Sequence, residues 1–486
     1  MDKVVNEGMS HMSVRPKLSI LECDQIEEIL QASLEVLART GVEVHDERSR
    51  SILLQAGAHA GHGDRVYLTA GLVRRCLATV PASVRVCDRR GRTAMRLEGY
   101  RAYFGAGSDT PYVLDHETGE RRTATLADVQ TAARVADALA NIDFHMSLAL
   151  ASDVPAAVYD RYTFAAMVRN TVKPIVLTAT DDAGLRDILR MCDVIAGGRE
   201  AFLTNPFVVL YGEYISPLVH PATALHKLLL ASELGLPQIY TGSPMAGGTA
   251  PATFAGVLTV AMADFLVGMA LSQLVRPGAP ILMGGVPSIC EMTHANISYG
   301  IEMHLLCAAL SDIGHYLRIP TWSVAGASDA KVIDEQAGIE CASSVIFAAL
   351  SGANLIHDVG YLDLAMTGSL EMMVMSDEVI SMTRRAVRGI EVSAETLAVE
   401  VIDRVGPGNQ FFIDEHTLRH FRSEFWFPSL ISRGGWAAWE KAGRLTFKDR
   451  GRARLQHIVR EHRPEPLPAD VDGAIDAILE GVAHEG

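Results

Sequence analysis

The amino-acid sequence predicts an α/β protein centred on a (β/α)8 barrel, the TIM barrel, because short apolar runs alternate with helical patterns through the middle of the chain. The eight runs begin at Ala102, Asp143, Pro174, Phe207, Pro237, Pro280, Pro320 and Asn354. Their nearly continuous apolar character indicates strands buried on both faces, as in parallel sheets. Eight such units favour a closed barrel. A doubly wound open sheet is the alternative, because a periodic pattern does not reveal closure.

The boundaries of the elements follow from their first residues and from the helical patterns between them. Several runs open with proline, which a strand tolerates at its first residue but not in its centre. Amphipathic patterns predict helices at Leu126–Ala140, Ala183–Ala196, Ala222–Leu234, Phe254–Leu274, Ile301–Leu317, Gln336–Leu350 and Glu371–Val387. We expect residues 96–392 to form the catalytic barrel and residues 1–95 a mostly helical extension with a helix at Cys23–Arg39. Residues 393–486, with a closing helix at Ala469–Val482, should pack on the barrel or on a partner subunit.

Composition and charge exclude several classes of protein. With 49% hydrophobic and 21% charged residues, the chain of 486 residues has the balance of an ordinary well-packed globule. Its net charge of −15 argues against nucleic-acid binding, which needs a basic face. The apolar segment Ala255–Leu274 contains Asp264 and Gln273, so it predicts a core helix and no membrane span. Seven dispersed cysteines without a CxxC pair, and no signal-peptide pattern, indicate a cytoplasmic protein.

Function in a barrel belongs to the carboxyl ends of the strands and to the loops that follow them. The residues at those positions are Gly105–Asp109, Ser147, Thr178, Thr180, Tyr211, Glu213, Tyr214, Thr241, Ser243, Met245, Met283–Gly285, Trp322, Ser328–Lys331, His357, Asp358 and Tyr361. Small residues are frequent among them, and glycine lets a bulky ligand approach the backbone. We therefore expect a wide mouth bordered by Gly105, Gly107, Ser243, Gly284 and Gly285, although turn chemistry alone explains any single one of them.

Aromatic and acidic side chains gather at the same strand ends. The aromatic residues are Tyr103, Phe104, Tyr211, Tyr214, Trp322 and Tyr361, and the acids are Glu213, Asp329 and Asp358. A quaternary ammonium is held by aromatic faces and by carboxylates at a distance, because it has no N–H to donate. The pattern therefore indicates a quaternary-amine site, with barrel packing as the alternative for Trp322 and some of the tyrosines. Lys331 either pairs with Asp334 in solvent or binds a substrate carboxylate.

Other catalytic patterns are weak. His294, Glu302, His304 and Cys307 are close in sequence, but no HExxH pattern is present. A helix that begins near Tyr299 would place Glu302 and His304 on different faces, so we expect no metal site here. GxSxG and P-loop motifs are also absent, which leaves hydrolase and nucleotide-binding functions unsupported.

Four long motifs resemble the signature regions of the trimethylamine methyltransferase family. They are the stretch 326–363 that starts "GASDAKVIDEQAG", the stretch 104–143 that starts "FGAGSDTPYVLDHETGERR", "TGSPMAGGTAPATF" from Thr241, and "SDEVISMTRR" from Ser376. The resemblance implies a (β/α)8 barrel that moves a methyl group from a methylated amine to the cobalt of a corrinoid on a partner protein. The archaeal trimethylamine enzymes contain pyrrolysine. This chain has only standard residues and is similar to the branch without pyrrolysine, whose members demethylate quaternary amines such as glycine betaine.

The resemblance and the residues together predict a methyltransferase for a betaine-like quaternary amine. A neutral tertiary amine leaves without a proton donor, so the enzyme mainly desolvates the substrate and aligns methyl, nitrogen and cobalt. The expected cage is Tyr211, Tyr214, Trp322 and Tyr361, with Tyr103 and Phe104 beside it. The expected catalytic residues are Glu213, Asp329 and Lys331; Asp358 adds negative potential, and Lys331 or His357 holds the substrate carboxylate.

The expected cofactor is a corrinoid (cobalamin) on a partner corrinoid-binding protein, approaching across the glycine-bordered mouth, with no metal of the chain's own. We also expect a homo-oligomer and no nucleic-acid or membrane partner. Two other functions remain open: a metal-dependent barrel enzyme that uses His294, Glu302 and Cys307, and a non-catalytic protein that binds a quaternary amine. The sequence does not show whether the methyl group finally reaches a corrinoid or a folate.

Overall fold

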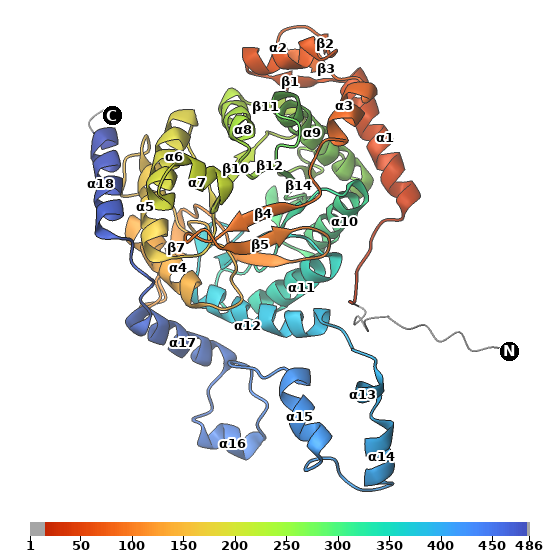
Figure 1. Ribbon diagram of the computed structural model, residues 1–486, viewed down its shortest axis with the longest axis vertical. Helices are drawn as coiled ribbons and strands as arrows, with labels where there is room; N and C mark the ends of the chain where they lie inside the picture. The colour runs from red at the N-terminus through yellow and green to blue at the C-terminus, as the bar shows by residue number, and fades with distance from the viewer. Residues whose placement is uncertain (1–14, 484–486) are drawn as a thin grey trace, which may run out of the picture.

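The centre of the protein is a parallel β-sheet that curves into a barrel (Figure 1). The structure is a computed structural model and describes residues 15–483. The strands, in their order across the sheet, are β6 (Tyr103–Ala106), β18 (Leu355–Val359), β17 (Thr321–Val324), β14 (Ile281–Gly284), β12 (Gln238–Thr241), β10 (Val208–Glu213) and β9 (Ile175–Leu177). Every neighbouring pair is parallel, as continuous apolar runs predict.

The run that begins at Asp143 closes the barrel between the two edge strands. Gly105 of β6 forms a parallel bridge with Phe144, and His145 forms one with Ile175 of β9. The backbone N–H of Val176 donates to the carbonyl of His145 at 3.0 Å. All eight predicted runs therefore take part in one barrel, which confirms the predicted fold class over the open sheet.

Helices cover the outside of the barrel (Figure 1). They are α4 (Leu126–Ala138), α5 (Tyr159–Asn170), α6 (Asp182–Ala196), α7 (Arg199–Thr204), α8 (Ala222–Leu234), α9 (Phe254–Val275), α10 (Ile301–Leu317), α11 (Glu335–Ser351) and α12 (Leu370–Val387). The seven predicted helices are present; α5 and the short α7 were not predicted. Helix α5 is the longer of the two. Its buried side includes Asp160 and Arg161, which obscure the apolar period of the helix.

Helix α9 is long and apolar enough to cross a membrane by length and composition, but 72% of its most apolar window is buried inside the fold. It packs against α1, α3 and α8 in the largest apolar cluster of the protein. The sequence-based interpretation of this segment as a core helix is confirmed.

An apolar hairpin fills the amino-terminal end of the barrel (Figure 1). Its strands β4 (Val84–Cys87) and β5 (Thr93–Leu97) place Val84, Val86, Met95 and Leu97 in one cluster with the barrel residues Phe144, Val209, Leu282 and Trp322. Cys87 N–H donates to the Pro206 carbonyl just before β10, which fixes the hairpin at the strand starts. Only the carboxyl end of the barrel is left open for a ligand.

The rest of the amino-terminal region lies beside the barrel. It contains α1 (Cys23–Arg39), β1 (Val42–Val44), α2 (Glu47–Gln55), β2 (His59–Ala60), β3 (Arg65–Tyr67) and α3 (Ala70–Leu77). β11 (Val219–His220), from the loop after β10, joins β1 in a small sheet and ties this region to the barrel. The expected boundary at residue 95 falls inside β5, so the plugging hairpin spans it.

Two small sheets flank the open end. One has the order β19 (Tyr361–Leu362), β20 (Thr367–Gly368), β7 (Tyr112–Leu114) and β8 (Arg121–Thr123). The other has β13 (Met245–Ala246), β15 (Ser288–Glu291) and β16 (Asn296–Ser298).

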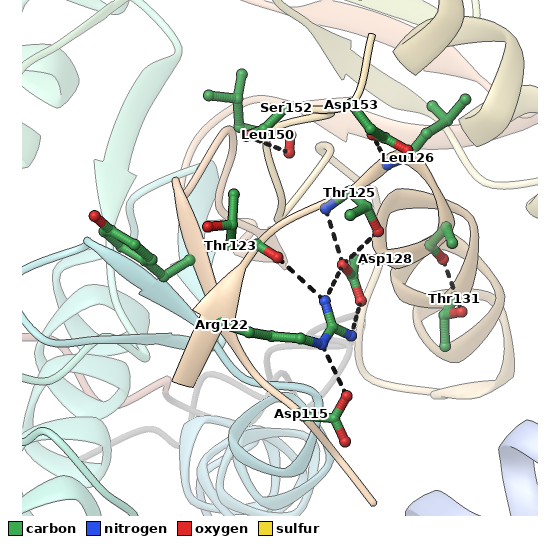
Figure 2. Close-up of polar contacts among 12 residues, drawn as sticks. Asp115, Arg122, Thr123, Thr125, Leu126, Asp128, Thr131, Leu150, Ser152 and Asp153 are labelled. Carbon is green, nitrogen blue, oxygen red and sulfur yellow. Dashed lines mark hydrogen bonds and ion pairs between the residues drawn. The ribbon is translucent and has the colours of Figure 1, made fainter. Parts of the chain in front are cut away.

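The "TGERR" turn of the family-like motif anchors the first of these sheets (Figure 2). Arg122 of β8 donates from Nε to Asp115 at 2.9 Å and from both terminal nitrogens to Asp128 at 2.7 and 2.8 Å. Asp128 also accepts from the backbone and hydroxyl of Thr125, forming the capping box of α4. These contacts hold the β7–β8 hairpin on the first turn of α4.

The carboxyl-terminal region has two parts (Figure 1). Helices α17 (Phe447–Glu461) and α18 (Ala469–Ala483) pack on the barrel helices. Residues 390–445, here called the C-terminal arm, stand off from the barrel and contain α13 (Ala394–Leu397), α14 (Val399–Val405), α15 (Glu415–Glu424) and α16 (Trp436–Lys441). None of these four helices has a buried residue. Backbone N–H groups of residues 429–431, donating to Glu378, attach the arm to α12.

Asp264 of α9 gives the fold a testable pH dependence. Its buried carboxylate accepts from Leu218 N–H at 2.8 Å and from the Ser216 hydroxyl at 3.2 Å, which holds the loop after β10. Burial raises the pKa of Asp264 to about 8. Between pH 4 and pH 8 the unfolded chain ionises this group while the folded chain keeps its proton. The free energy of unfolding therefore falls as the pH rises, by up to about 1.4 kcal/mol per pH unit.

Chemical denaturation from pH 5 to pH 8.5 measures this slope. Asp264→Asn keeps the shape without an ionisable proton, so it should lose stability less steeply with rising pH than the wild type. Equal slopes for the two chains would show that Asp264 is not the titrating group.

Candidate functional site

A cavity of about 460 Å³ opens at the carboxyl end of the barrel. Its residues come from strand ends, from the β15–β16 hairpin and from two helices. They are Ser108, Asp109, Tyr159, Thr178, Tyr211, Gly212, Glu213, Thr223, Ala224, Lys227, Ser243, Val286, Ile297, Tyr299, His357, Asp358, Tyr361 and Ala365. The volume is that of a small-molecule site, and the lining is mainly polar and aromatic.

Aromatic rings form one side of the cavity and the layer beneath it. Tyr211, Tyr299 and Tyr361 line the cavity itself. His357 stacks on Trp322, with ring centroids 4.1 Å apart and an angle of 18° between the planes. Tyr211 lies tilted against both rings, at 5.5 Å from Trp322 and 6.2 Å from His357. Trp322 is thus a floor beneath His357, in the apolar cluster that includes the hairpin.

Asp358 brings a buried carboxylate to this aromatic side. It is the penultimate residue of β18, has a φ of 79° and is 1% exposed. Its Oδ2 accepts from the Tyr299 hydroxyl at 3.3 Å, whereas Oδ1 has no hydrogen-bond partner among residues 15–483. His357 Nδ1 lies 2.5 Å from that oxygen without hydrogen-bond geometry, and neither imidazole nitrogen is paired within the same range. Backbone strain and unpaired buried polar atoms together mark a functional site.

Glu213 and Lys227 place opposite charges on another part of the wall. The Tyr211 hydroxyl donates to Glu213 Oε1. Burial raises the pKa of Tyr211 well above its ordinary value, and the Glu213 charge adds to this, so the phenol remains a donor. Lys227 of α8 donates to the Ala179 carbonyl at 2.6 Å. Burial lowers the pKa of Lys227, while nearby acids, Glu213 among them, oppose that effect.

Asp109 supplies a second acid in a different environment. It follows β6 with a φ of 53°, and its oxygens accept from the Ser147 hydroxyl at 2.7 Å and the Thr178 hydroxyl at 3.0 Å. Burial raises the pKa of Asp109. Burial, together with Asp109 and Asp160, raises the pKa of the neighbouring Tyr159 to about 12. Unlike Asp358, this carboxyl is paired at both oxygens.

The structure brings nine of the predicted strand-end residues to the cavity. They are Ser108, Asp109, Thr178, Tyr211, Glu213, Ser243, His357, Asp358 and Tyr361. All lie at or just after the carboxyl ends of strands, where the barrel geometry directs them.

Asp329 and Lys331, expected to be catalytic, do not line the cavity. Asp329 accepts from the Tyr299 backbone N–H and from the Ser298 hydroxyl, both at 3.0 Å. Lys331 is exposed and donates to the Asp329 carbonyl at 2.8 Å. The loop after β17 therefore braces the β15–β16 hairpin that precedes Tyr299. Direct contact of Asp329 and Lys331 with a substrate stays a prediction.

The expected aromatic residues Tyr214, Tyr103 and Phe104 also lie outside the cavity. Tyr214 packs against Tyr240 on the helix side of the sheet, and its hydroxyl donates to the Ala261 carbonyl at 3.4 Å. Phe104 faces the outer helices, and Tyr103 accepts from Arg96 N–H at the plugged end. Side chains alternate along a strand, so Tyr211 and Glu213 share the inner face while Tyr214 does not.

Most of the expected cofactor-bordering glycines serve packing inside the protein. A Cβ on Gly105 would lie 2.4 Å from the Phe144 ring, and one on Gly107 would lie 2.0 Å from the Tyr361 ring. A Cβ on Gly284 would lie 2.3 Å from the Trp322 carbonyl oxygen, and one on Gly285 would lie 3.2 Å from Leu310. The absence of a side chain at these positions admits aromatic rings and neighbouring strands. That these four residues also border a cofactor stays a prediction.

The metal alternative finds no support in the part of the chain that the structure describes. His294 is exposed and bonds to Glu291 at 2.8 Å, whereas Cys307 is buried. Within residues 15–483 these two residues and Glu302 do not form a metal-ligand cluster.

Nine cavity residues were not among the predicted positions, and three of them have titratable side chains that reach the cavity from outside the strand ends: Tyr159, Lys227 and Tyr299. Tyr159 and Lys227 belong to α5 and α8, and Tyr299 follows a hairpin, so none of them directly follows a barrel strand. The sequence contained one indication of Lys227: it is a lysine in the first half of α8, the helix that follows the strand end with Glu213.

A barrel closed at its amino end, with an aromatic and charged cavity at its carboxyl end, has the architecture of an enzyme for a small polar substrate. The chain belongs to the trimethylamine methyltransferase (MTTB) family, whose model matches residues 3–483. It is accordingly a methyltransferase.

The relatives cover the whole chain. It is 29% identical over 469 residues to the glycine betaine methyltransferase of Desulfitobacterium hafniense strain Y51, across 96% of this chain and 97% of the relative. It is 28% identical over 485 residues to the trimethylamine methyltransferase MttB of Methanosarcina barkeri, across 96% and 95%. The crystal structure of the monomethylamine methyltransferase MtmB of Methanosarcina barkeri superimposes with a TM-score of 0.51 at 12% identity, covering 91% of this chain and 89% of that chain, which shows the shared fold.

The bracing role of Asp329 predicts different effects for the two charged residues of its loop. Asp329→Ala leaves Tyr299 N–H and the Ser298 hydroxyl without their acceptor, so it should reduce stability by about 1–3 kcal/mol and speed hydrogen exchange in residues 288–299. Lys331→Met should change neither the stability nor the hydrogen-exchange rate of residues 288–299. If Lys331→Met lost turnover while its fold was unchanged, we would conclude that Lys331 contacts the substrate.

Proposed function

We propose that the protein transfers a methyl group from a betaine-like quaternary amine to the Co(I) of a corrinoid carried by a partner protein. The family to which the chain belongs transfers methyl groups to corrinoid proteins. The observation that carries the choice of substrate is the buried, half-paired carboxylate of Asp358 beside Tyr211, Tyr299 and Tyr361. That combination suits an organic cation, which the ring faces and the nearby carboxylate both attract.

The aromatic side of the cavity would hold the trimethylammonium head. Tyrosine rings attract a cation through their faces, and Asp358 and Glu213 add negative potential. Their hydroxyls are already engaged, since Tyr211 donates to Glu213 and Tyr299 donates to Asp358. The ring faces, and not the hydroxyls, are therefore free to contact the cation.

Lys227 would hold the substrate carboxylate in place of the originally expected Lys331. Lys227 is a cavity residue with one hydrogen bond, to Ala179, and two further N–H groups. An incoming carboxylate would favour its charged form against the effect of burial. The unpaired nitrogens of His357 are a second donor for the same carboxylate. The cavity thus offers both signs of charge that a betaine requires.

Methyl transfer in this site needs alignment more than acid–base catalysis. A Co(I) corrinoid on the partner supplies the nucleophile that accepts the methyl group. The C–N electron pair stays on the departing tertiary amine, which leaves neutral and takes no proton. The side chains of the site bind and orient the ammonium, and the enclosed aromatic wall excludes water. Since the hairpin of β4 and β5 plugs the amino end, the nucleophile must approach through the carboxyl-end mouth.

Lys227→Met tests the carboxylate contact. Methyl transfer to free cob(I)alamin, followed by its absorbance, is measured with glycine betaine, carnitine and tetramethylammonium. Loss of one charge-assisted hydrogen bond should lower kcat/KM for the betaines by about 10- to 100-fold and leave tetramethylammonium unaffected. An equal fall in kcat/KM for all three substrates would show that Lys227 does not recognise the carboxylate.

Asp358→Asn is the matched variant for the other end of the substrate. It removes a charge near the ammonium without changing shape, so it should weaken transfer from all three substrates alike. Tight binding of betaine without any alkylation of cobalamin would contradict the enzyme proposal and favour a binding protein. Alkylation only when tetrahydrofolate replaces cobalamin would overturn the corrinoid as acceptor.

We further propose that a second copy of the chain covers the C-terminal arm. Of the 22 large apolar side chains exposed in the described chain, 13 lie between residues 390 and 445. Phe412 is 77% exposed and Ile413 is 89% exposed at the arm's far loop. Apolar surface of this density marks an association site.

Light scattering coupled to size-exclusion chromatography tests self-association. The wild type should elute as an oligomer, and Phe412→Ser combined with Ile413→Ser should shift it towards the monomer. Ile339→Ser, which removes an equally exposed side chain from α11, should leave the mass unchanged. A monomeric wild type at tens of micromolar would overturn the proposal.

A further inference from the structure

The C-terminal arm contains a cluster of potential metal ligands that the methyl-transfer site does not use. Glu395 of α13 faces His416 and His420 of α15, and one ligand atom from each lies within 4.8 Å of the others. His420 Nε2 is 2.9 Å from Glu395 Oε1, and His416 Nε2 is 3.1 Å from the Glu395 carbonyl. The two imidazole centroids are 4.3 Å apart.

The donor set suits a divalent ion of the zinc type. Two histidines at positions i and i+4 share one face of a helix, so both can reach the same ion. Two imidazoles and a carboxylate are a three-ligand set for Zn²⁺, with a fourth position left for water. A cavity of about 250 Å³ that includes Glu395, His420, Ser393 and Thr396 adjoins the cluster and gives space for that water.

The backbone positions of the three ligands are already fixed. Ser393 and Thr396 form a capping box at the start of α13, two residues before and one residue after Glu395. Asp414 caps α15 and accepts from His416 N–H at 2.9 Å. Arg419 competes for the carboxylate at 3.4 Å, but its side chain is largely exposed and can turn into solvent. Little rearrangement is therefore needed to admit an ion.

The arm also lacks the usual means of holding helices together. None of the helices α13 to α16 has a buried residue, so no apolar core joins α13 to α15. Small structural units without a sufficient core are commonly stabilised by a metal or a disulfide. Cysteines are absent between residues 390 and 445, which leaves a metal as the available cross-link.

We propose that Glu395, His416 and His420 bind one zinc-class divalent ion that joins α13 to α15 and orders the C-terminal arm. The site belongs to the arm and is separate from the cavity at the carboxyl end of the barrel (Figure 1). It is structural, so the methyl-transfer chemistry proposed above does not depend on it.

Zinc binding to the untagged full-length protein, stripped with a chelator and redialysed, tests the site. The wild type should take up about one equivalent of Zn²⁺ by elemental analysis, and Co²⁺ should give the visible absorption of a low-symmetry site. His416→Ala combined with His420→Ala should weaken Zn²⁺ binding by more than about 100-fold. His59→Ala combined with His457→Ala, which removes two exposed imidazoles elsewhere, should retain full binding.

Limited proteolysis tests whether the bound ion orders the C-terminal arm. Zn²⁺ should slow proteolytic cleavage within residues 390–445 of the wild type at least several-fold, and it should not protect the His416→Ala, His420→Ala chain. Less than a tenth of an equivalent of bound zinc in the wild type, or equal affinity in the two double variants, would overturn the proposal. Unchanged cleavage in the presence of bound zinc would overturn its role as a cross-link.

Discussion

The site depends on the apolar layer that fills the barrel beneath Trp322. The β4–β5 hairpin contributes Val86 and Met95 to this layer and closes the amino end, so polar chemistry is confined to the carboxyl end. His357 stacks on Trp322 at 4.1 Å, which fixes its ring plane while its nitrogens remain unpaired within residues 15–483. Because the floor is rigid and dry, the charges above it act at close range with little screening by solvent. A solvated barrel interior would weaken each of these contacts.

Two buried aspartates at the open end show how local contacts assign different roles to one side-chain type. Asp109 accepts from Ser147 and Thr178 and is satisfied at both oxygens. Asp358 accepts only from Tyr299, and its second oxygen lies 2.5 Å from His357 Nδ1 and has no hydrogen bond among the described residues. Both have positive φ values, at 53° and 79°, so both are held in strained backbone by their surroundings. Strain and an oxygen without a hydrogen bond coincide at Asp358 alone of the two, and for that reason the proposed function places the ammonium on its side of the cavity.

The periodic pattern predicted the barrel because each of the eight apolar runs can be recognised from its own residues. The rule that barrel sites lie at the carboxyl ends of strands then predicted Tyr211, Glu213 and His357, because each lies at the end of an apolar run. It failed for Tyr214, where one step along the strand reverses the direction of the side chain. Lys227 and Tyr299 could not be located, because they reach the cavity from a helix and a hairpin whose placement depends on tertiary packing. The bracing contacts of Asp329 could not be predicted for a related reason: its partners, Ser298 and Tyr299, are 31 and 30 residues away in sequence.

The charged loop that carries Asp329 belongs to a wider pattern at the barrel mouth. Arg122 joins the β7–β8 hairpin to α4, Arg121 bonds to Asp363 across the small sheet, and Asp329 joins the β15–β16 hairpin to the loop after β17. These contacts are polar and partly exposed, whereas the barrel below is held by apolar packing. Individual exposed ion pairs contribute little free energy, so the rim can shift at low cost while the floor cannot. The proposed transfer to a corrinoid on a partner protein would use that combination: a fixed substrate platform beneath a rim that can adapt to a large planar cofactor.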